Sequence, residues 1–421
     1  MSSRQLSDWL EHYMAFTENT EPPMLYHLWS GLTAISTTLR RKCYTNWGSN
    51  KYLYPNLYVC LVGPPGGRKG TAMKIIKPML GEIKKADGKP ISLGAESLGS
   101  IQALYQEIIE SKDVFKDSKG NTKDHKSLSV WSDEFQVYLS DRDPTFMAVL
   151  TDLFDCADNW KYRTVSRKIE DVSHCFLTII GAITPSLLQA KLTSDAIGGG
   201  LVSRIIFVVG YGPAKRIALP FYTEQELEWQ KKLQHDLQRI ANLTGPFKLP
   251  NEYLNIYAKW YNNTTTDDGV NSEKFIGYNS RRSMHLNKIS MLVSAAESDD
   301  MILLPHHFEK ALAILEITET EMGNAFQGYG GGSHAGALAT ILMWIEHQDK
   351  FSFTQICNKF YLEALPNEMS IFMEVAVQRG LVTKTKAPTD VWYEVQTKKV
   401  SGKGDEYLNE TVLRLMIGNL K

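Results

Sequence analysis

Hydrophobic residues recur at helical spacing through the first forty positions of the chain. Residues 6–17 and 24–40 each place large apolar side chains on one face, which predicts two amphipathic helices. Glu21-Pro22-Pro23 separates them. Arg40-Arg41-Lys42 closes the second helix, and positive charge is favoured at a helix C-terminus. We therefore expect a helical collar over residues 1–50, whose terminal cations form a solvated helix end rather than a binding patch.

A continuous apolar run over residues 57–62 predicts a buried strand. It stops at residues 63–67, Gly-Pro-Pro-Gly-Gly, and a helical pattern begins a few residues later. Strand, glycine-rich turn, lysine and helix can hold a phosphate, because backbone N–H groups and the ammonium point at the anion. The candidate nucleotide-binding residues of this loop are Gly63, Gly66, Gly67, Arg68, Lys69, Gly70 and Thr71.

The loop departs from the Walker A pattern at two positions. Lys69 has the expected spacing from Gly63, but Arg68 stands where a second glycine is usual. Gly70 stands where Ser or Thr normally binds magnesium, and Thr71 could supply that hydroxyl if the turn is reshaped. The alternative is an ordinary glycine-rich turn between a strand and a helix.

A second apolar strand, over residues 127–132, ends in Asp133 and Glu134. This ending is typical of the Walker B motif, in which the aspartate holds Mg²⁺ and the glutamate polarises the attacking water. A buried strand that happens to end in acids is the alternative. Between the loop and this strand, the sequence predicts a short strand over 91–97 and a helix over 98–110. That order favours a doubly wound nucleotide-binding core.

Two polar segments flank the next elements. Residues 111–126 are rich in turn formers, which predicts an exposed loop. Residues 161–172 alternate and turn near Ser166, which predicts a β-hairpin. This hairpin could enter a pore and follow a nucleic-acid backbone, or it could be a solvated edge protected by charge, and both interpretations stay open. Its cations are Lys161, Arg163, Arg167 and Lys168.

A third buried strand, over residues 174–183, ends at Thr184. In P-loop ATPases of this layout, a polar residue at that point senses the γ-phosphate. A glycine-rich turn over 198–200 then leads to Arg204, which is a candidate arginine finger for the γ-phosphate of a neighbouring subunit. The alternative for Arg204 is a surface arginine that pairs with an acid.

Helical patterns dominate the following hundred residues, and they predict a helical lid over residues 216–327. This lid would place Arg281 or Arg282 near the nucleotide. His285, His306 and His307 are predicted to be structural, because no second set of metal ligands accompanies them. The helical patterns cover residues 222–243, 250–262 and 280–326.

A glycine-rich linker over residues 328–333 separates the last part of the chain. Residues 333–421 contain three helical patterns and two strands, which predicts a winged helix. Its recognition helix carries Glu368 and Glu374, which disfavour contact with DNA, so that phosphate contacts would have to come from lysines near the wing. Binding to another protein, or packing on the ATPase, is the alternative.

Composition limits the classes of function. The chain has 421 residues, of which 43% are hydrophobic and 22% are charged, as in a globular protein of two or three domains. The net charge of −1 excludes a polycation, so any nucleic-acid site must be a local basic patch. Five scattered cysteines, with no apolar run of membrane-spanning length and no signal-peptide pattern, favour a reduced, cytoplasmic protein without contact with a membrane.

Taken together, these motifs resemble the P-loop ATPases that bacteriophages and related mobile elements encode as replicative helicases, often linked to a primase. The likeness covers about residues 8–215 and, more weakly, the lid to about 325. The segments that carry it are 21–23, 54–58, 63–72, 95–97, 133–135, 181–185 and 198–207.

The resemblance implies an α/β fold of the AAA+-like (ASCE) P-loop class, with a parallel sheet, an N-terminal helical collar, a helical lid and a C-terminal winged helix. The ATPase core would span residues 51–215. The implied function is a ring-forming, hexameric motor, with ATP and Mg²⁺ as cofactors, that moves along single-stranded DNA in the bacterial host cytoplasm. A primase or another replication protein is an implied partner, and the chain itself shows no priming segment.

Residue roles follow from the same resemblance. ATP binding falls to Lys69 and Thr71, and Mg²⁺ binding to Asp133 with Thr71. Catalysis falls to Glu134, γ-phosphate sensing to Thr184 and the finger to Arg204. In RecA-like helicases the water-activating glutamate ends the strand after the P-loop helix, which here is Glu96, so Glu96 stays a second candidate. The functional alternative is a DNA-binding ATPase switch, such as a helicase loader or an initiator, that does not unwind DNA.

Overall fold

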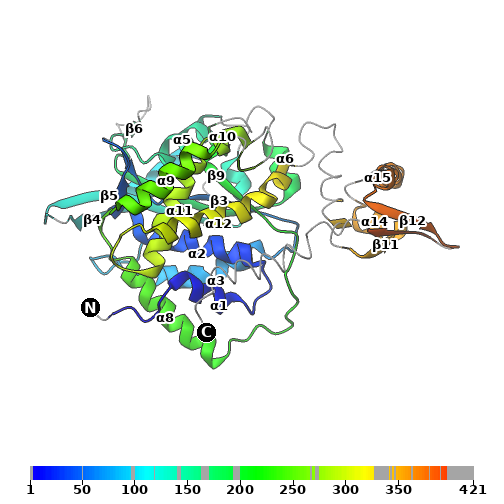
Figure 1. Cartoon of the computed structure of the whole chain (residues 1–421), viewed down its shortest axis with the longest axis horizontal. Coiled ribbons are helices and arrows are strands. Elements are labelled where there is room, and N and C mark those ends of the chain that lie inside the picture. The colour runs from blue at the N-terminus through cyan, green and yellow to red at the C-terminus, as the bar shows by residue number, and fades with distance from the viewer. Residues whose placement is uncertain are drawn as a thin grey trace.

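The chain folds as a mixed α/β protein (Figure 1). The computed structural model describes residues 3–49, 51–95, 100–117, 119–139, 144–162, 170–192, 200–265, 268–270, 275–326, 341, 344–345, 348–361, 364–378, 380–388 and 390–395. In this part of the chain, no helix is long and apolar enough to span a bilayer.

Helices make up most of the regular structure. The α-helices are α1 (Trp9–Thr17), α2 (Met24–Leu39), α3 (Lys69–Gly81), α4 (Ile101–Glu110), α5 (Pro144–Phe154), α6 (Pro185–Lys191), α8 (Glu224–Ile240), α9 (Asn251–Asn263), α10 (Ile276–Asn279), α11 (Arg282–Glu297), α12 (Pro305–Met322), α14 (Phe353–Lys359) and α15 (Pro366–Gln378). Short 3₁₀ helices are η1 (Arg40–Lys42), η2 (Phe135–Tyr138), η3 (Val202–Arg204) and η5 (Gly323–Phe326).

Within the described ranges, the strands form four sheets. They are β1 (Cys43–Asn46), β2 (Tyr52–Leu53), β3 (Tyr58–Val62), β4 (Lys112–Lys116), β5 (Thr122–Ser132), β6 (Lys161–Tyr162), β7 (Glu170–Asp171), β8 (Cys175–Ile183), β9 (Ile205–Val209), β10 (Gly245–Phe247), β11 (Lys350–Ser352), β12 (Val382–Lys386) and β13 (Val391–Val395). The smaller sheets have the orders β10-β1-β2, β11-β13-β12 and β6-β7.

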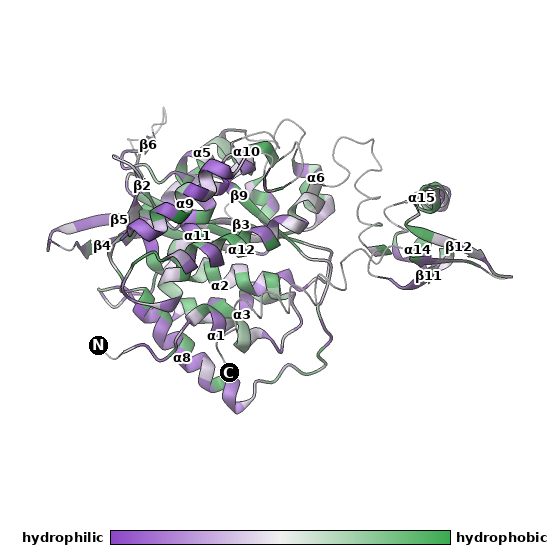
Figure 2. Cartoon of the chain, in the orientation of Figure 1, coloured by the Kyte–Doolittle hydropathy of each residue, from purple (hydrophilic) through white to green (hydrophobic). Residues whose placement is uncertain are grey.

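The central sheet has the order β4-β5-β8-β3-β9, and its last four strands run parallel. Strands β3 and β9 are buried along their whole length and are coloured as hydrophobic in Figure 2. After β3 the chain leads through α3 toward the β5 side, whereas after β8 it leads through α6 to β9 on the other side. The carboxyl ends of β3 and β8 therefore flank a switch point, which is where open parallel sheets bind ligands.

Of the predicted short strand over 91–97, the structure describes residues 91–95, and these form one parallel bridge. Leu93 pairs with Ser129 of β5, and the N–H of Gly94 donates to the carbonyl oxygen of Ser129 at 2.8 Å. This bridge adds a contact at the outer edge of β5, beyond the segment that pairs with β4. Glu96, at the end of the predicted strand, lies outside the described residues.

Helix α2 is buried on almost every side rather than on one face. Small hydroxyl side chains let it approach the sheet closely, because each can hydrogen-bond while it packs. Ser36 shares a hydrogen bond of 2.9 Å with Thr178 of β8, and Thr37 shares one of 2.7 Å with Ser129 of β5. Side chains of the predicted collar, core and lid all contribute to one continuous hydrophobic core. The boundaries between those three units stay predictions.

The cations at the end of α2 are buried, so the predicted solvated helix end is wrong. Arg40, Arg41 and Lys42 are each no more than 6% exposed. Arg41 donates to Asp158 at 2.5 Å, and Arg40 is ion-paired with Asp113. Because the sequence places these acids more than seventy residues away, spacing alone could not reveal the pairs.

Residues 111–126 form a hairpin rather than the predicted exposed loop. Strand β4 pairs antiparallel with the first half of β5, from Lys112 opposite Lys126 to Lys116 opposite Thr122. The turn formers Asp117, Gly120 and Asn121 lie in the short connection between the two strands. The polar residues Asp113 and His125 are buried in the hairpin, since they face the cations of η1.

The C-terminal part has its own hydrophobic core. Side chains from α14, α15 and the three-stranded sheet β11-β13-β12 pack around Phe351, Met369 and Tyr393. Helices and a small antiparallel sheet agree with the predicted composition of this part, whereas its assignment as a winged helix stays a prediction.

Candidate nucleotide-binding site

The glycine-rich loop joins β3 to α3 at the carboxyl edge of the central sheet. Its first residue, Gly63, has no room for a side chain, because a Cβ there would meet the Tyr26 hydroxyl and the Gly210 carbonyl oxygen. Tyr26 of α2 donates to the carbonyl oxygen of Val62 at 2.8 Å and to that of Gly210 at 3.2 Å. This side chain therefore fastens the ends of β3 and β9 together beneath the loop.

Arg68 adopts the left-handed conformation with φ of 61°. This backbone conformation costs a non-glycine residue about 1 kcal/mol and is the reason why glycine is usual in such loops. The Arg68 guanidinium lies 2.6 Å from the carboxylate of Glu21, between α1 and α2. The side chain thus contacts its own chain and holds the loop against the N-terminal segment.

Lys69 folds back over the loop. Its ammonium donates to the carbonyl oxygens of Gly63 at 2.6 Å and Pro64 at 2.8 Å. Burial lowers the pKa of Lys69 to about 8. A partly buried ammonium surrounded by loop carbonyls is well placed to exchange those contacts for an anionic phosphate.

Gly70 lies directly against Asp133, the residue that follows β5. A Cβ on Gly70 would be 2.7 Å from Asp133 Oδ1. Lys74, one helical turn later on the same face, places its ammonium 2.6 Å from Asp133 Oδ2. Both side chains of this pair are solvent-accessible, with exposed fractions of 65% for Lys74 and 40% for Asp133.

The predicted use of Thr71 in place of the missing hydroxyl gains no support from this geometry. Consecutive helical residues point about 100° apart, and Thr71 is exposed, whereas Gly70 faces the carboxylate. Asp133 fits a hard cation such as Mg²⁺, because its carboxylate is accessible beside the loop.

Two further predicted residues lie at the same edge. Glu134 is exposed next to Asp133, and its backbone N–H donates to Ser132 Oγ at 3.1 Å. Thr184 follows β8 and is the N-cap of α6, where its hydroxyl accepts from the Leu187 N–H. Because Ile183 is paired with Val62, Thr184 lies beside the start of the loop.

Arg204 and Arg281 lie at the opposite edge of the sheet. Arg204 precedes β9, whose first residue is paired with the first residue of β3, about 13 Å along the strands from the loop. Arg281 of the helical segment donates to Ser203 Oγ at 2.9 Å and therefore belongs to the same end. Arg281, predicted to lie near the nucleotide, is thus at the end of the strands away from the loop of its own chain.

Arg204 is also buried, with a side chain only 6% exposed. It donates to Asp155 at 2.7 Å and to the carbonyl oxygen of Gly200 at 2.7 Å. A finger must present its guanidinium to another subunit, and this one is enclosed by its own chain. The pairing with an acid fits the alternative interpretation, although Arg204 is buried rather than at the surface, and it disfavours the predicted finger.

Of the predicted basic hairpin, the structure describes the two residue pairs at its base. Lys161 pairs with Asp171 and Tyr162 with Glu170, which joins β6 to β7. Lys161 is exposed. The other three cations, Arg163, Arg167 and Lys168, lie outside the described residues.

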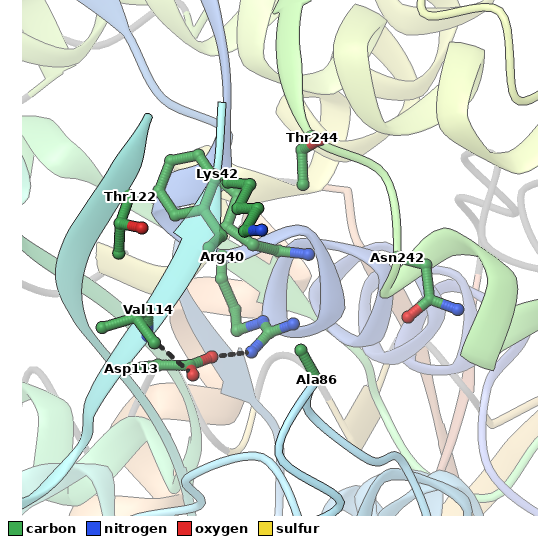
Figure 3. Close-up of a pocket in the computed structure, with 10 residues that line it drawn as sticks. Arg40, Lys42, Ala86, Asp113, Val114, Thr122, Asn242 and Thr244 are labelled. Carbon is green, nitrogen blue, oxygen red and sulfur yellow. Dashed lines mark hydrogen bonds and ion pairs between the residues drawn. The ribbon is translucent and has the colours of Figure 1, made fainter. Parts of the chain in front are cut away.

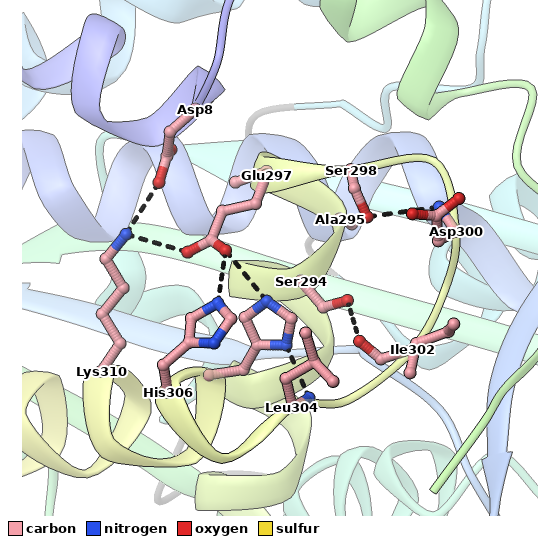
Figure 4. Close-up of polar contacts among 12 residues, drawn as sticks. Asp8, Ser294, Ala295, Glu297, Ser298, Asp300, Ile302, Leu304, His306 and Lys310 are labelled. Carbon is pink, nitrogen blue, oxygen red and sulfur yellow. Dashed lines mark hydrogen bonds and ion pairs between the residues drawn. The ribbon is translucent and has the colours of Figure 1, made fainter. Parts of the chain in front are cut away.

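A cluster of Glu297, His306 and His307 resembles a metal site but is better explained by hydrogen bonding (Figure 4). The Leu304 N–H donates to His307 Nδ1 at 2.9 Å, which leaves the ring proton on Nε2, 3.0 Å from Glu297. A metal-bound histidine needs the reverse arrangement. Lys310 also lies 3.0 Å from Glu297 and competes with a cation, so the predicted structural role of these histidines fits.

Three residues of this site were not predicted: Tyr26, Glu21 and Lys74. The helical spacing of Gly70 and Lys74 was a usable signal, because positions four apart share a face. The contacts of Tyr26 and Glu21 depend on how α2 lies on the sheet, which no local pattern encodes.

Comparison of the chain with models of known protein families finds no match, and neither does comparison with the curated proteins.

Proposed function

We propose that the chain is a P-loop ATPase that binds ATP and Mg²⁺ at the loop after β3 and couples hydrolysis to movement along single-stranded DNA. One observation carries the nucleotide site: the ammonium of Lys69 lies within the glycine-rich loop, and the Asp133 carboxylate lies beside the start of the following helix. Both groups are at the switch point of a parallel sheet, where phosphates are usually bound.

In this proposal each side chain has a separate task. Loop N–H groups and Lys69 bind the β- and γ-phosphates, and Asp133 holds Mg²⁺, which neutralises charge on those phosphates. Glu134 accepts a proton from the attacking water, and the Thr184 hydroxyl contacts the γ-phosphate. Lys74 moves away from Asp133 when the cation binds, since both cannot occupy the same carboxylate oxygen.

Strand order supports an AAA+-like core, because β8 separates the strand of Asp133 from the strand of the loop. Ring formation and the pore role of the basic hairpin rest on the resemblance. A trans-acting arginine is not assigned to Arg204. Arg281, which lies beside Arg204, is partly exposed on the side of the sheet opposite the loop. Arg281 could act in trans only if a neighbouring subunit approached that side.

The decisive experiment measures three quantities on the full chain: binding of a fluorescent ATP analogue, phosphate release with and without single-stranded DNA, and opening of a forked duplex. Lys69→Met should abolish analogue binding, whereas Lys84→Met, the same charge change on an exposed residue after α3, should not. Stimulated hydrolysis with duplex opening supports the motor. Unchanged binding in Lys69→Met would overturn the nucleotide site.

The second candidate is an ATPase switch that binds DNA or a replication protein without unwinding. One observation favours it: the solvent-facing side of α15 carries the exposed apolar residues Ile371 and Val375 and the acid Glu374, whose charge is paired with Lys384 of β12. Such a face suits a protein partner better than DNA phosphates. Hydrolysis stimulated by DNA without opening of the forked duplex would favour this candidate.

A further inference from the structure

A cavity of about 450 Å³ lies between the β4–β5 hairpin and the residues that follow α8 (Figure 3). Thr122, the first residue of β5, lines it, whereas Asp133 follows the last residue of that strand. Eleven residues of extended strand place Thr122 about 35 Å from Asp133. It is therefore separate from the nucleotide loop.

Two buried cations line this cavity. Arg40 is 5% exposed and Lys42 is 4% exposed. Arg40 is ion-paired with Asp113, and its Nε atom has no hydrogen-bond partner among the described residues. Asp113 is the acid among the described lining residues, so the cavity has an excess of positive charge.

Capping of α8 explains only part of this arrangement. The carbonyl oxygen of Ala241, at the C-terminus of α8, accepts from Lys42 at 2.6 Å and from Arg40 at 3.1 Å. One cation is enough to complement the end of a helix. Burial of a second cation costs desolvation free energy that the Ala241 carbonyl oxygen does not offset. An anion bound in the cavity would offset this cost.

Apolar side chains form another wall of the cavity. Val114 is 49% exposed and lies beside Phe115 on β4. Figure 3 shows Arg40 and Lys42 between this wall and the polar residues Asn242 and Thr244. A cavity of this volume with a few convergent polar groups is typical of small-molecule sites.

We propose that this cavity binds a small organic anion, whose carboxylate or phosphate group contacts Arg40 and Lys42 and whose apolar part lies against Val114 and Phe115. The site is independent of the nucleotide loop, because it shares no residue with it.

A proton should accompany the anion. Burial, with the nearby charge of Arg40, lowers the pKa of Lys42 to about 7, whereas Cys43 and Asp113 act to raise it; His125 also interacts with Lys42, and Lys116 lines the same cavity. An anion next to Lys42 favours the charged ammonium and raises this pKa. Binding at pH 7.5 should therefore take up a fraction of a proton, and the uptake should vanish near pH 5.5.

The test uses two anionic probes that share an aromatic ring, phenyl phosphate and benzoate, with benzyl alcohol as the neutral control. Calorimetry on the full chain in two buffers of different ionisation enthalpy gives affinity and proton uptake together. The Lys69→Met variant removes binding at the nucleotide loop. A preference for one probe then identifies the anionic group.

Val114→Asp places a negative charge on the exposed wall without changing the buried cations. It should weaken probe binding about tenfold or more, because like charges repel strongly at this range. Lys123→Met, which changes the net charge equally on the same hairpin but outside the cavity, should leave affinity within about twofold. Lys42→Met should abolish binding and proton uptake if the variant folds.

Absence of binding by both anions, or equal affinity for benzyl alcohol, would overturn the proposal. Equal affinity in the Val114→Asp variant would also overturn it, and this variant stays informative if Lys42→Met does not fold. Probe binding that is lost in Lys69→Met would assign the ligand to the nucleotide loop instead.

Discussion

Replacement of Lys74 by methionine should make nucleotide binding less dependent on the Mg²⁺ concentration. The ammonium of Lys74 lies 2.6 Å from Asp133 Oδ2, so it occupies the carboxylate that we assign to the cation. The pair is largely exposed, and exposed ion pairs contribute at most about 1 kcal/mol. Its loss should therefore lower the Mg²⁺ concentration for half-maximal binding by up to about fivefold.

A titration of Mg²⁺ at fixed concentration of a fluorescent ATP analogue measures this effect. Lys84→Met is the matched control, because it removes the same charge from an exposed position farther from Asp133. Raising the salt concentration from about 0.05 M to about 0.5 M shortens the Debye length and screens the Lys74–Asp133 pair. The difference in Mg²⁺ requirement between Lys74→Met and the wild type should therefore shrink. An unchanged or higher Mg²⁺ requirement in Lys74→Met would refute competition and show that Lys74 instead positions Asp133.

Three further outcomes are expected. Gly63→Ala should lower stability by about 1–3 kcal/mol in thermal unfolding, because its Cβ meets the Gly210 carbonyl oxygen at 2.6 Å; an unchanged melting temperature would contradict this packing. Affinity for the ATP analogue should fall as pH rises through about 8, where free Lys69 loses its proton, and a flat profile to pH 10 would contradict the role of this ammonium. Asp155→Asn should destabilise the fold by about 1–3 kcal/mol while sparing analogue binding, since it leaves the buried Arg204 without its charge partner; full stability would reopen the finger assignment.

Local patterns predicted the elements that carry the site, but not the contacts between them. The apolar runs that form β3, β5 and β8 each end where the structure ends the strand, because burial on both faces produces a continuous apolar sequence. The ends of these strands then bring the loop, Asp133 and Thr184 to one edge. Long-range charge pairs were not predictable in this way.

The errors share a physical cause. Arg40 and Arg204 were interpreted from their neighbours in sequence, as a solvated end and as an exposed finger. In the structure each is buried by segments distant in sequence and paired with an acid, Asp113 or Asp155. The sequence around a cation next to a turn does not show whether tertiary packing will bury it. The pattern of apolar residues on its own element is the same for a buried and for an exposed cation.

The two departures of the loop from the Walker A pattern are connected through the structure. At position 68 the arginine accepts an unfavourable backbone conformation but gains an ion pair with Glu21. At position 70 the glycine leaves space that the Asp133 carboxylate fills, and Lys74 then neutralises that carboxylate. The charges of Arg68 and Asp133, on either side of the loop, are thus paired with opposite charges of the same chain. Nucleotide entry must exchange these contacts, so we expect the departures to tune affinity for ATP and Mg²⁺ rather than to abolish binding.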